Sequence, residues 1–332
     1  MKPNVLPYLL AGLLLLAAGC GGTDGPDPGR SMLAAAQEHP WQTGRSNGRE
    51  LRSEHYRIFT TCSNRMLVQY LPGFMEAAHD NYLSLTGLAA DPAAERMSIY
   101  LMGSRDEWET LTRAITGPYA GIYMNIEAGG FCYEGVGVFW DIGGLGTLSV
   151  ASHEGLHQFF HQQMTDQLPL WLEEGMCVSA EGYAVHGDRV LFTPARNPGR
   201  AASLRRAIVE GDWLGIDELL PMDAGDAIGG HGVDRTRKAV GYYAQLWALV
   251  QMLRARPAYR DGLERLIRDA QAGRLHEALG YPRFKLDQLR RQGRAYTHVV
   301  GEPLFLHYIS DDLEAFEREY RAFARELVGL ET

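Results

Sequence analysis

The feature that most constrains the fold of this chain is a pair of histidines, His153 and His157, with Glu154 directly after the first. Residues four apart lie on one face of an α-helix, one turn above another. Both imidazole rings can therefore point at one metal ion if this segment is helical, and its flanking residues favour a helix. Glu154 leaves such a helix at a different angle, so it can reach a water molecule on the metal without being a ligand. That is the position of a general base.

A catalytic zinc site usually has three protein ligands and a water molecule, and the two histidines supply only two of these ligands. A second motif offers a third. His-Glu-x-x-His-Gln at 153–158 is followed by Pro-x-Trp-Leu-x-Glu-Gly at 169–175. This order resembles the gluzincin metallopeptidases, in which a second helix supplies a glutamate to the metal. The glutamate directly before the glycine has that role in the family, and it is Glu174 here. The resemblance implies one Zn²⁺ per chain, held by His153, His157 and Glu174.

The chain is also similar to a family of exported bacterial proteins called domain of unknown function 1570. Those proteins share the order of a strand-rich lobe, the two motifs and a later helix that resembles 243–249, and the similarity spans about 55–255. The resemblance implies that the protein has a zincin-like fold and hydrolyses peptide bonds. In that reaction Glu154 would take a proton from the metal-bound water and pass it to the leaving amine.

A peptidase of this kind needs a hydrogen-bond donor for the oxyanion of its tetrahedral intermediate. Related enzymes use a tyrosine or histidine of the helical lobe, and Tyr243, Tyr242 and His231 are the candidates here. We favour Tyr243, because it lies on the helix that resembles the family pattern. Packing in the core is the alternative for both tyrosines.

The residues next to the expected ligands are assigned a role from the direction in which each would point on a helix. Glu173 points about 100° away from Glu174 and is expected to face solvent. Glu181 returns to nearly the same face as Glu174, so it either orients a histidine ligand or lies at the surface. His161 lies too far round its helix to complete a compact site. Cys177 is expected to be a small buried residue rather than a fourth ligand.

The N-terminus carries the most apolar segment, residues 5–18, between Lys2 and Gly19-Cys20. This segment is shorter than the roughly 20 residues that span a bilayer, and it has the pattern of a secretory signal peptide. The sequence Ala17-Ala18-Gly19-Cys20 resembles the lipobox of bacterial lipoproteins. We therefore expect lipidation at Cys20, with an ordinary secretory signal as the alternative. No Asp follows Cys20, which favours the outer membrane or the cell surface over the inner membrane.

Composition excludes other classes of protein. A formal charge of −9 with no long run of Lys or Arg does not suit a nucleic-acid partner. A hydrophobic content of 45% excludes a largely disordered chain. Export implies an oxidising compartment, where Cys62, Cys132 and Cys177 allow at most one disulfide that the sequence does not assign.

The predicted fold class is α+β, with a small strand-rich lobe, a mainly helical lobe and the zinc cleft between them. The expected divisions are a signal peptide at 1–19, a flexible tether at 20–50, an α/β lobe at 51–145 and a helical lobe at 146–332. Expected strands are 55–61, 96–102 and the pair 120–125 and 131–141, and expected helices are 64–86, 104–116, 146–164, 168–183, 199–210, 238–255, 257–271, 283–293 and 311–328. Residues 223–236 are rich in Gly and Asp and are predicted to form a mobile loop.

The strand at 136–140 directly precedes the motif helix. It is expected either to form the cleft wall, where an extended peptide would pair with its edge, or to be an interior strand with no open edge.

The sequence thus predicts an exported, membrane-anchored zinc metallopeptidase that acts on a peptide or protein. Two other classes stay open, a catalytically silent surface binding module with a peptidase-like fold and a zinc hydrolase of a non-peptide bond. Substrate specificity, endo- or exopeptidase action and oligomeric state are not determined by the sequence.

Overall fold

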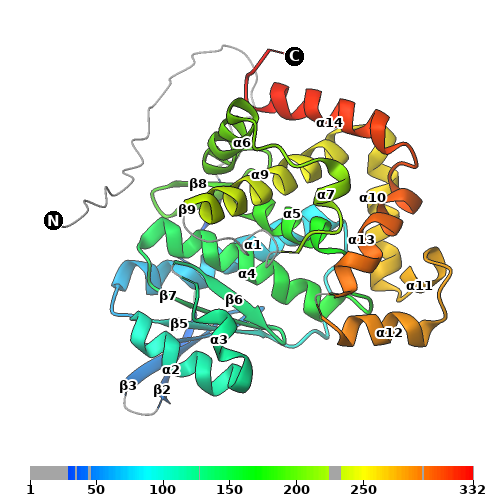
Figure 1. Ribbon diagram of the computed structural model, residues 1–332. Coiled ribbons are helices and arrows are strands. Elements are labelled where there is room, and N and C mark those ends of the chain that lie inside the picture. The colour runs from blue at the N-terminus through cyan, green and yellow to red at the C-terminus, as the bar shows by residue number, and fades with distance from the viewer. Residues whose placement is uncertain are drawn as a thin grey trace.

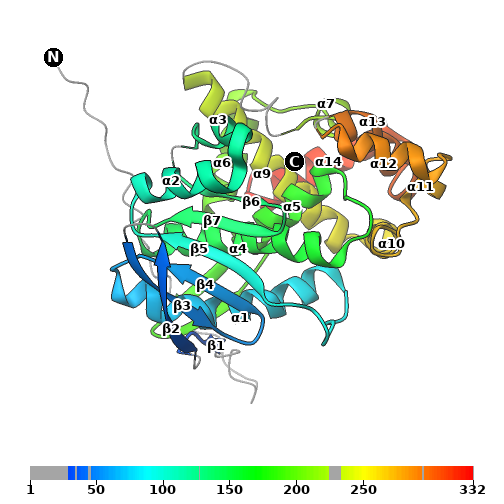
Figure 2. The same cartoon turned by 90° about the horizontal axis from the view of Figure 1, so that it is seen from below.

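The computed structural model of the protein describes residues 29–33, 36–43, 46–126, 128–223, 233–293 and 295–331. It is a mixed α+β structure with a strand-rich N-terminal part and a helical C-terminal part, as the sequence predicts (Figures 1 and 2). The predicted signal peptide, Cys20 and His231 lie outside the described residues, as does most of the predicted loop at 223–236.

A six-stranded sheet forms the base of the N-terminal part, in the order β2-β3-β4-β5-β7-β6. Strands β4, β5 and β7 run parallel to one another, and the remaining neighbours pair antiparallel. The strands are β2 (Gln37–Thr43), β3 (Ser46–Arg52), β4 (Tyr56–Thr60), β5 (Met97–Met102), β6 (Gly130–Tyr133) and β7 (Val136–Trp140).

The expected flexible tether at 20–50 is wrong for the described residues from Arg30 onward. Arg30 and Ser31 pair with Val190 and Arg189, Met32 is fully buried, and β2 pairs with β3 in a hairpin. The Gly, Pro and Ser content of this segment is typical of a linker, yet Trp41 anchors the hairpin on the sheet. The Trp41 ring lies 5.3 Å from that of Phe59 and 5.8 Å from that of Tyr100. The folded body therefore begins well before His55.

The expected pairing of 120–125 with 131–141 is also wrong. Residues 117–123 form a 3-10 turn, η1 (Gly117–Tyr119), and a short helix, α3 (Ala120–Tyr123). The two paired strands are instead β6 and β7, joined by Glu134 and Gly135 with φ of 49° and 76°. Two consecutive residues with positive φ are typical of a tight hairpin turn, so the apparent single strand folds back on itself.

Helices cover both faces of the sheet (Figure 2). On one face α2 (Arg105–Thr116) packs on β5 and β7, and Trp108, Phe131 and Trp140 form a small aromatic core beneath it. On the other face lie α1 (Arg65–Thr86) and α4 (Gly144–Gln163), whose apolar side chains join the main core. Pro72, a possible kink, lies inside a continuous α1.

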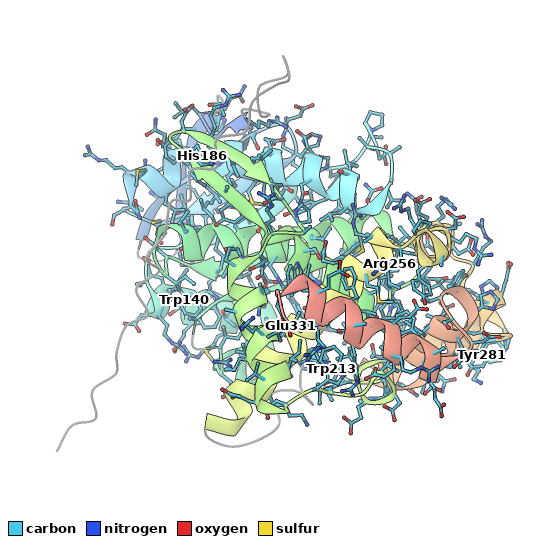
Figure 3. The ribbon with its side chains drawn as sticks, turned by 90° about the horizontal axis from the view of Figure 1, so that it is seen from above. Trp140, His186, Trp213, Arg256, Tyr281 and Glu331 are labelled. Carbon is cyan, nitrogen blue, oxygen red and sulfur yellow. The ribbon has the colours of Figure 1, made fainter. Side chains whose placement is uncertain are left out.

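The C-terminal part surrounds α9 (Figure 1). Its helices are α5 (Leu170–Ala180), α6 (Pro198–Glu210), α7 (Ile216–Leu219), α9 (Val233–Ala255), α10 (Pro257–Gln271), α11 (Leu275–Ala278), α12 (Arg283–Arg291), α13 (Ala295–Tyr308) and α14 (Leu313–Leu327). Trp213, between α6 and α7, packs on Tyr320 of α14 at 4.9 Å between ring centres (Figure 3).

Two parts of this region differ from the prediction. The helix expected at 168–183 ends at Ala180, and β8 (Tyr183–His186) and β9 (Arg189–Phe192) follow, with β1 (Arg30–Ser31) on the far side of β9. Helix α13 is not predicted, because it contains Gly301 and Pro303. The glycine is needed for close packing: a Cβ there would lie 2.2 Å from the carbonyl oxygen of Leu220.

Candidate metal centre

Helix α4 holds His153 and His157 on one face, as predicted, with their ring centres 5.2 Å apart. Two contacts fix this helix in the fold. The Gln158 side-chain amide donates hydrogen bonds to the carbonyl oxygens of Ser98 and Gly135, at 2.7 and 2.8 Å, and so ties α4 to the sheet. Gly155, inside the motif, allows α1 to approach, because a Cβ there would lie 2.5 Å from the hydroxyl of Tyr82.

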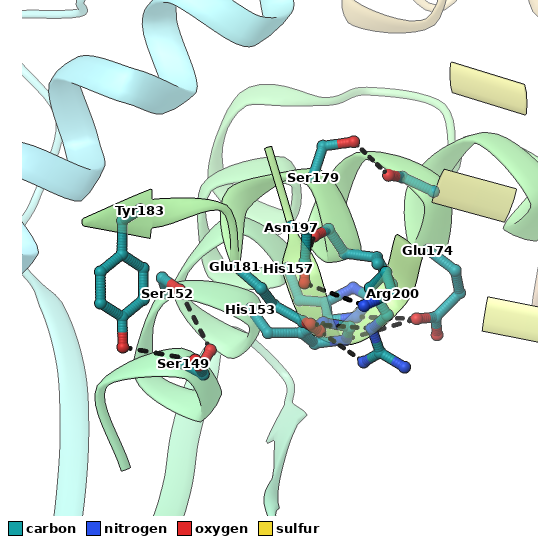
Figure 4. A network of polar contacts seen from close by, with 12 residues as sticks. Ser149, Ser152, His153, His157, Glu174, Ser179, Glu181, Tyr183, Asn197 and Arg200 are labelled. Atoms are coloured by element: carbon teal, nitrogen blue, oxygen red, sulfur yellow. Dashed lines mark hydrogen bonds and ion pairs between the residues drawn. The ribbon is translucent and has the colours of Figure 1, made fainter. Parts of the chain in front are cut away.

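Glu174 reaches the two histidines from α5, as the resemblance implies. Its Oε2 lies 3.4 Å from Nε2 of His153 and 3.7 Å from Nε2 of His157 (Figure 4). This oxygen is buried and forms no hydrogen bond with the described residues. Two ligands of a tetrahedral zinc ion, each about 2.0–2.2 Å from it, lie roughly 3.3–3.6 Å apart. The two separations lie within or just above this range, so the donor set could hold a tetrahedral metal ion.

The other nitrogen of each imidazole is bound by a carboxylate. His153 Nδ1 donates to Glu181 Oε1 at 2.9 Å, and His157 Nδ1 donates to Glu173 Oε1 at 2.8 Å. These bonds fix the proton on Nδ1 and leave the Nε2 lone pairs for a metal, as in many metal-binding histidines. Of the two alternatives for Glu181, orienting a histidine is the one seen.

The expectation that Glu173 faces solvent is wrong, because its side chain is only 16% exposed. Adjacent residues on α5 point about 100° apart, but the imidazole of His157 is wide enough to meet both of them. Glu174 approaches Nε2 of His157, and Glu173 approaches Nδ1 on the other side of the same ring.

Arg200, which the sequence analysis did not single out, completes this network. From the first turn of α6, its Nε and Nη2 donate to Oε2 and Oε1 of Glu181, at 3.0 and 2.8 Å. Its guanidinium carbon lies 5.5 Å from the ring centre of Tyr243. No sequence motif marks Arg200, since only the fold brings the first turn of α6 to Glu181, at the C-terminal end of α5.

Of the two adjacent tyrosines of α9, only Tyr243 adjoins the histidines. Its ring centre lies 6.5 Å from that of His153. Tyr242 is fully buried, and its hydroxyl donates to the carbonyl oxygen of Met222 at 3.2 Å. Tyr242 is therefore a core residue. His161 is exposed beside Gly135, outside the site, as expected.

Cys177 lies closer to the histidines than expected. It is fully buried, and potential ligand atoms of His153, His157 and Cys177 all lie within 4.8 Å of one another. Burial raises the pKa of its thiol, so the sulfur is protonated at neutral pH and binds a metal poorly. Cys62, Cys132 and Cys177 are all free thiols, so the structure has no disulfide among them.

The electrostatics of the site favour a cation. Burial opposes a charge on His153, but the neighbouring carboxylates of Glu174 and Glu181 outweigh it and raise the pKa to about 9. Burial likewise opposes ionisation of Glu174, but the two histidines hold the pKa of this carboxyl well below its usual range. A site that holds protons this strongly has a negative potential, which also attracts a metal ion.

Glu154, the candidate general base, follows His153 on α4. It is 9% exposed, and burial raises the pKa of its carboxyl. The edge strand of the sheet next to α4 is β6, and β7 lies in the interior between β5 and β6. The first alternative for 136–140, an open edge on this strand, is therefore wrong.

Comparison with models of protein families, with curated proteins and with solved structures found no match. Among the described residues, no helix is both long and apolar enough to cross a bilayer.

Proposed function

We propose that this protein is a zinc-dependent hydrolase of peptide bonds, with a zincin-like fold and ligands of the gluzincin type. One observation carries the proposal: the buried Oε2 of Glu174 lies 3.4 and 3.7 Å from the Nε2 atoms of two histidines. Carboxylates on both Nδ1 atoms orient these imidazoles towards the same point.

In this proposal His153, His157 and Glu174 hold one zinc ion per chain. When bound, the zinc would polarise the scissile carbonyl and lower the pKa of its water towards 7. The carboxylate of Glu154 accepts the proton of that water and later delivers it to the leaving amine. Its burial supports this role, because a raised pKa makes the carboxylate a stronger base for the proton of a water molecule.

Tyr243 is proposed to donate a hydrogen bond to the oxyanion. Its ring adjoins that of His153, and burial raises the pKa of its hydroxyl well above the ordinary value. The hydroxyl therefore stays protonated and remains a donor at any physiological pH.

The substrate is proposed to be an extended peptide that pairs with the free edge of β6. This strand ends the sheet in the part of the chain that the structure describes, and α4 packs on it and on β7. We further propose that the protein is exported and lipid-anchored at Cys20, on the outer membrane or the cell surface.

The test is elemental analysis of the purified protein, combined with cleavage of a broad peptide library. We expect about one zinc per chain and metal-dependent cleavage. A fully zinc-loaded protein that cleaves no peptide would instead favour a binding module, or a hydrolase of another bond if it cleaves an ester.

A further inference from the structure

Arg200 has an unused hydrogen-bonding edge beside the candidate metal centre. A planar guanidinium offers two edges at which parallel N–H groups can bind a carboxylate. Glu181 occupies the edge formed by Nε and Nη2, at 3.0 and 2.8 Å. The other edge, formed by Nη1 and the second hydrogen of Nη2, has no partner among the described residues. Figure 4 shows the remaining nitrogen turned away from Glu181.

The position of this edge is fixed by the contacts of the site. Nη2 of Arg200 and Nδ1 of His153 bind the same oxygen, Oε1 of Glu181. The guanidinium carbon lies over the Tyr243 ring, 5.5 Å from its centre, so the ring adjoins the guanidinium. The Arg200 side chain is 23% exposed, so it is mostly sheltered and part of it remains open to solvent.

We infer that the free edge of Arg200 binds the α-carboxylate at the C-terminus of a peptide, and that the enzyme is an exopeptidase acting at that end. This inference rests on the proposed function and extends it to a substrate class. Arg200 would be a specificity-determining residue.

Charge supports a carboxylate as the ligand. Four carboxylates surround the histidines, and an anionic chain end would be repelled by them unless a cation faced it. Arg200 is the cation that the described residues place beside His153 and Tyr243. Its ion pair with Glu181 neutralises one charge and holds the guanidinium still, so little side-chain entropy is lost when a second carboxylate binds.

The location also sets the length of the released fragment. An extended peptide advances about 3.3 Å per residue. Nη2 of Arg200 and Nδ1 of His153 bind the same oxygen of Glu181, so the arginine is close to the His153 ring. A peptide carboxylate bound to Arg200 would therefore belong to a residue one or two positions from the peptide bond that lies at the Nε2 atoms. The product would be a single amino acid or a dipeptide.

The primary test needs no variant. Calorimetry would compare binding of N-acetylated dipeptide acids with that of the corresponding amides, on metal-free and zinc-loaded protein. We expect the acids to bind about 10- to 100-fold more tightly, since hydrogen bonds between charged groups have this effect. Equal affinity of acid and amide in both forms would overturn the inference.

Variants then assign the preference to Arg200. Arg200→Gln should bind the acid and the amide with equal affinity, and Arg200→Lys should keep a reduced preference for the acid. The control is Arg206→Gln, at an exposed position of the same helix, which should show the same preference as the original protein. An undiminished preference in a folded Arg200→Gln protein would contradict the assignment.

Cleavage separates this inference from the proposed function. Equal cleavage of free and amidated peptides would refute exopeptidase action and leave the peptidase intact. Binding of the acids without cleavage of any peptide would support the carboxylate site and refute the peptidase.

Discussion

Nδ1 of His157 and Oε1 of Glu173 are 2.8 Å apart, and this bond joins the motif helix to the helix that carries Glu174. The same kind of bond joins His153 to Glu181. Each carboxylate fixes the tautomer and the angle of one imidazole, so the two histidines are held ready for a metal.

Removing either partner should weaken the metal site without destroying it. We expect Glu173→Ala and Glu181→Ala each to reduce zinc affinity by about 10- to 100-fold, the effect usual for residues that orient a ligand. Competition with a chromogenic chelator measures this affinity. Glu95→Ala, at an exposed loop position, is the control and should match the original protein. Unchanged affinity in both site variants would show that these carboxylates do not orient the ligands.

The adjacent tyrosines of α9 should separate catalysis from stability. Tyr243→Phe should keep its zinc and lose about 10²- to 10³-fold in kcat, because an oxyanion donor is removed. Tyr242→Phe should keep its activity and lose about 1 kcal/mol in free energy of unfolding, because it loses a buried hydrogen bond to Met222. If instead Tyr242→Phe lost the activity and Tyr243→Phe kept it, the assignment would be reversed.

Gly155 should not tolerate a side chain. A Cβ there would lie 2.5 Å from the Tyr82 hydroxyl and 2.7 Å from Met75 Cε, so Gly155→Ala would push α4 away from α1. We expect a loss of about 1–3 kcal/mol in free energy of unfolding, together with weaker zinc binding. Gly144→Ala, on the same helix with no atom within 4 Å of its Cβ, should be neutral in both measurements. A stable Gly155→Ala protein with full zinc would contradict this packing.

His79 should make the protein sensitive to mild acid. The side chain is buried, and burial together with the charge of His55, stacked 3.8 Å away, lowers its pKa to about 4. The unfolded chain binds the proton at about pH 6.5, so the contribution of His79 to stability is constant above that pH and falls between pH 6.5 and 4.

His79 should lower the free energy of unfolding by about 2 kcal/mol at pH 5 relative to pH 7.5. Glu76, whose pKa is lowered to about 2, acts in a separate window, because its contribution is lost only as the pH falls below about 4.5. The effect is measured by urea unfolding at pH 7.5 and at pH 5. The proteins compared are the original, His79→Phe and, as an exposed control, His186→Phe. The prediction fails if His79→Phe keeps the pH dependence of the original.

The sequence was sufficient to predict the parts of the site that depend on one helix. His153 and His157 lie four residues apart, and the helical period alone brings them together. Most of the long helices, though not α13, and the strands at 56–60 and 97–102 were predicted for the same reason, because their apolar residues repeat with a local period.

What the sequence could not supply depends on tertiary contacts. Arg200 reaches Glu181 only because the start of α6 lies at the C-terminal end of α5. Glu173 is largely shielded from solvent because its carboxylate binds the His157 ring across two helices. The hairpin around Trp41 resembles a linker in composition, and it is ordered by aromatic contacts with Phe59 and Tyr100, distant in sequence.

The central claim is that Glu154 performs the chemistry while Glu174 holds the metal. The most direct test measures zinc content and peptide cleavage on Glu154→Gln and Glu174→Gln side by side. An amide at position 154 can still hydrogen-bond to the water but cannot accept its proton, so Glu154→Gln should keep one zinc and lose at least about 10²- to 10⁴-fold in rate. Glu174→Gln should lose zinc itself, because a charged ligand is removed. Equal zinc loss in both variants, or undiminished cleavage by Glu154→Gln, would contradict the account.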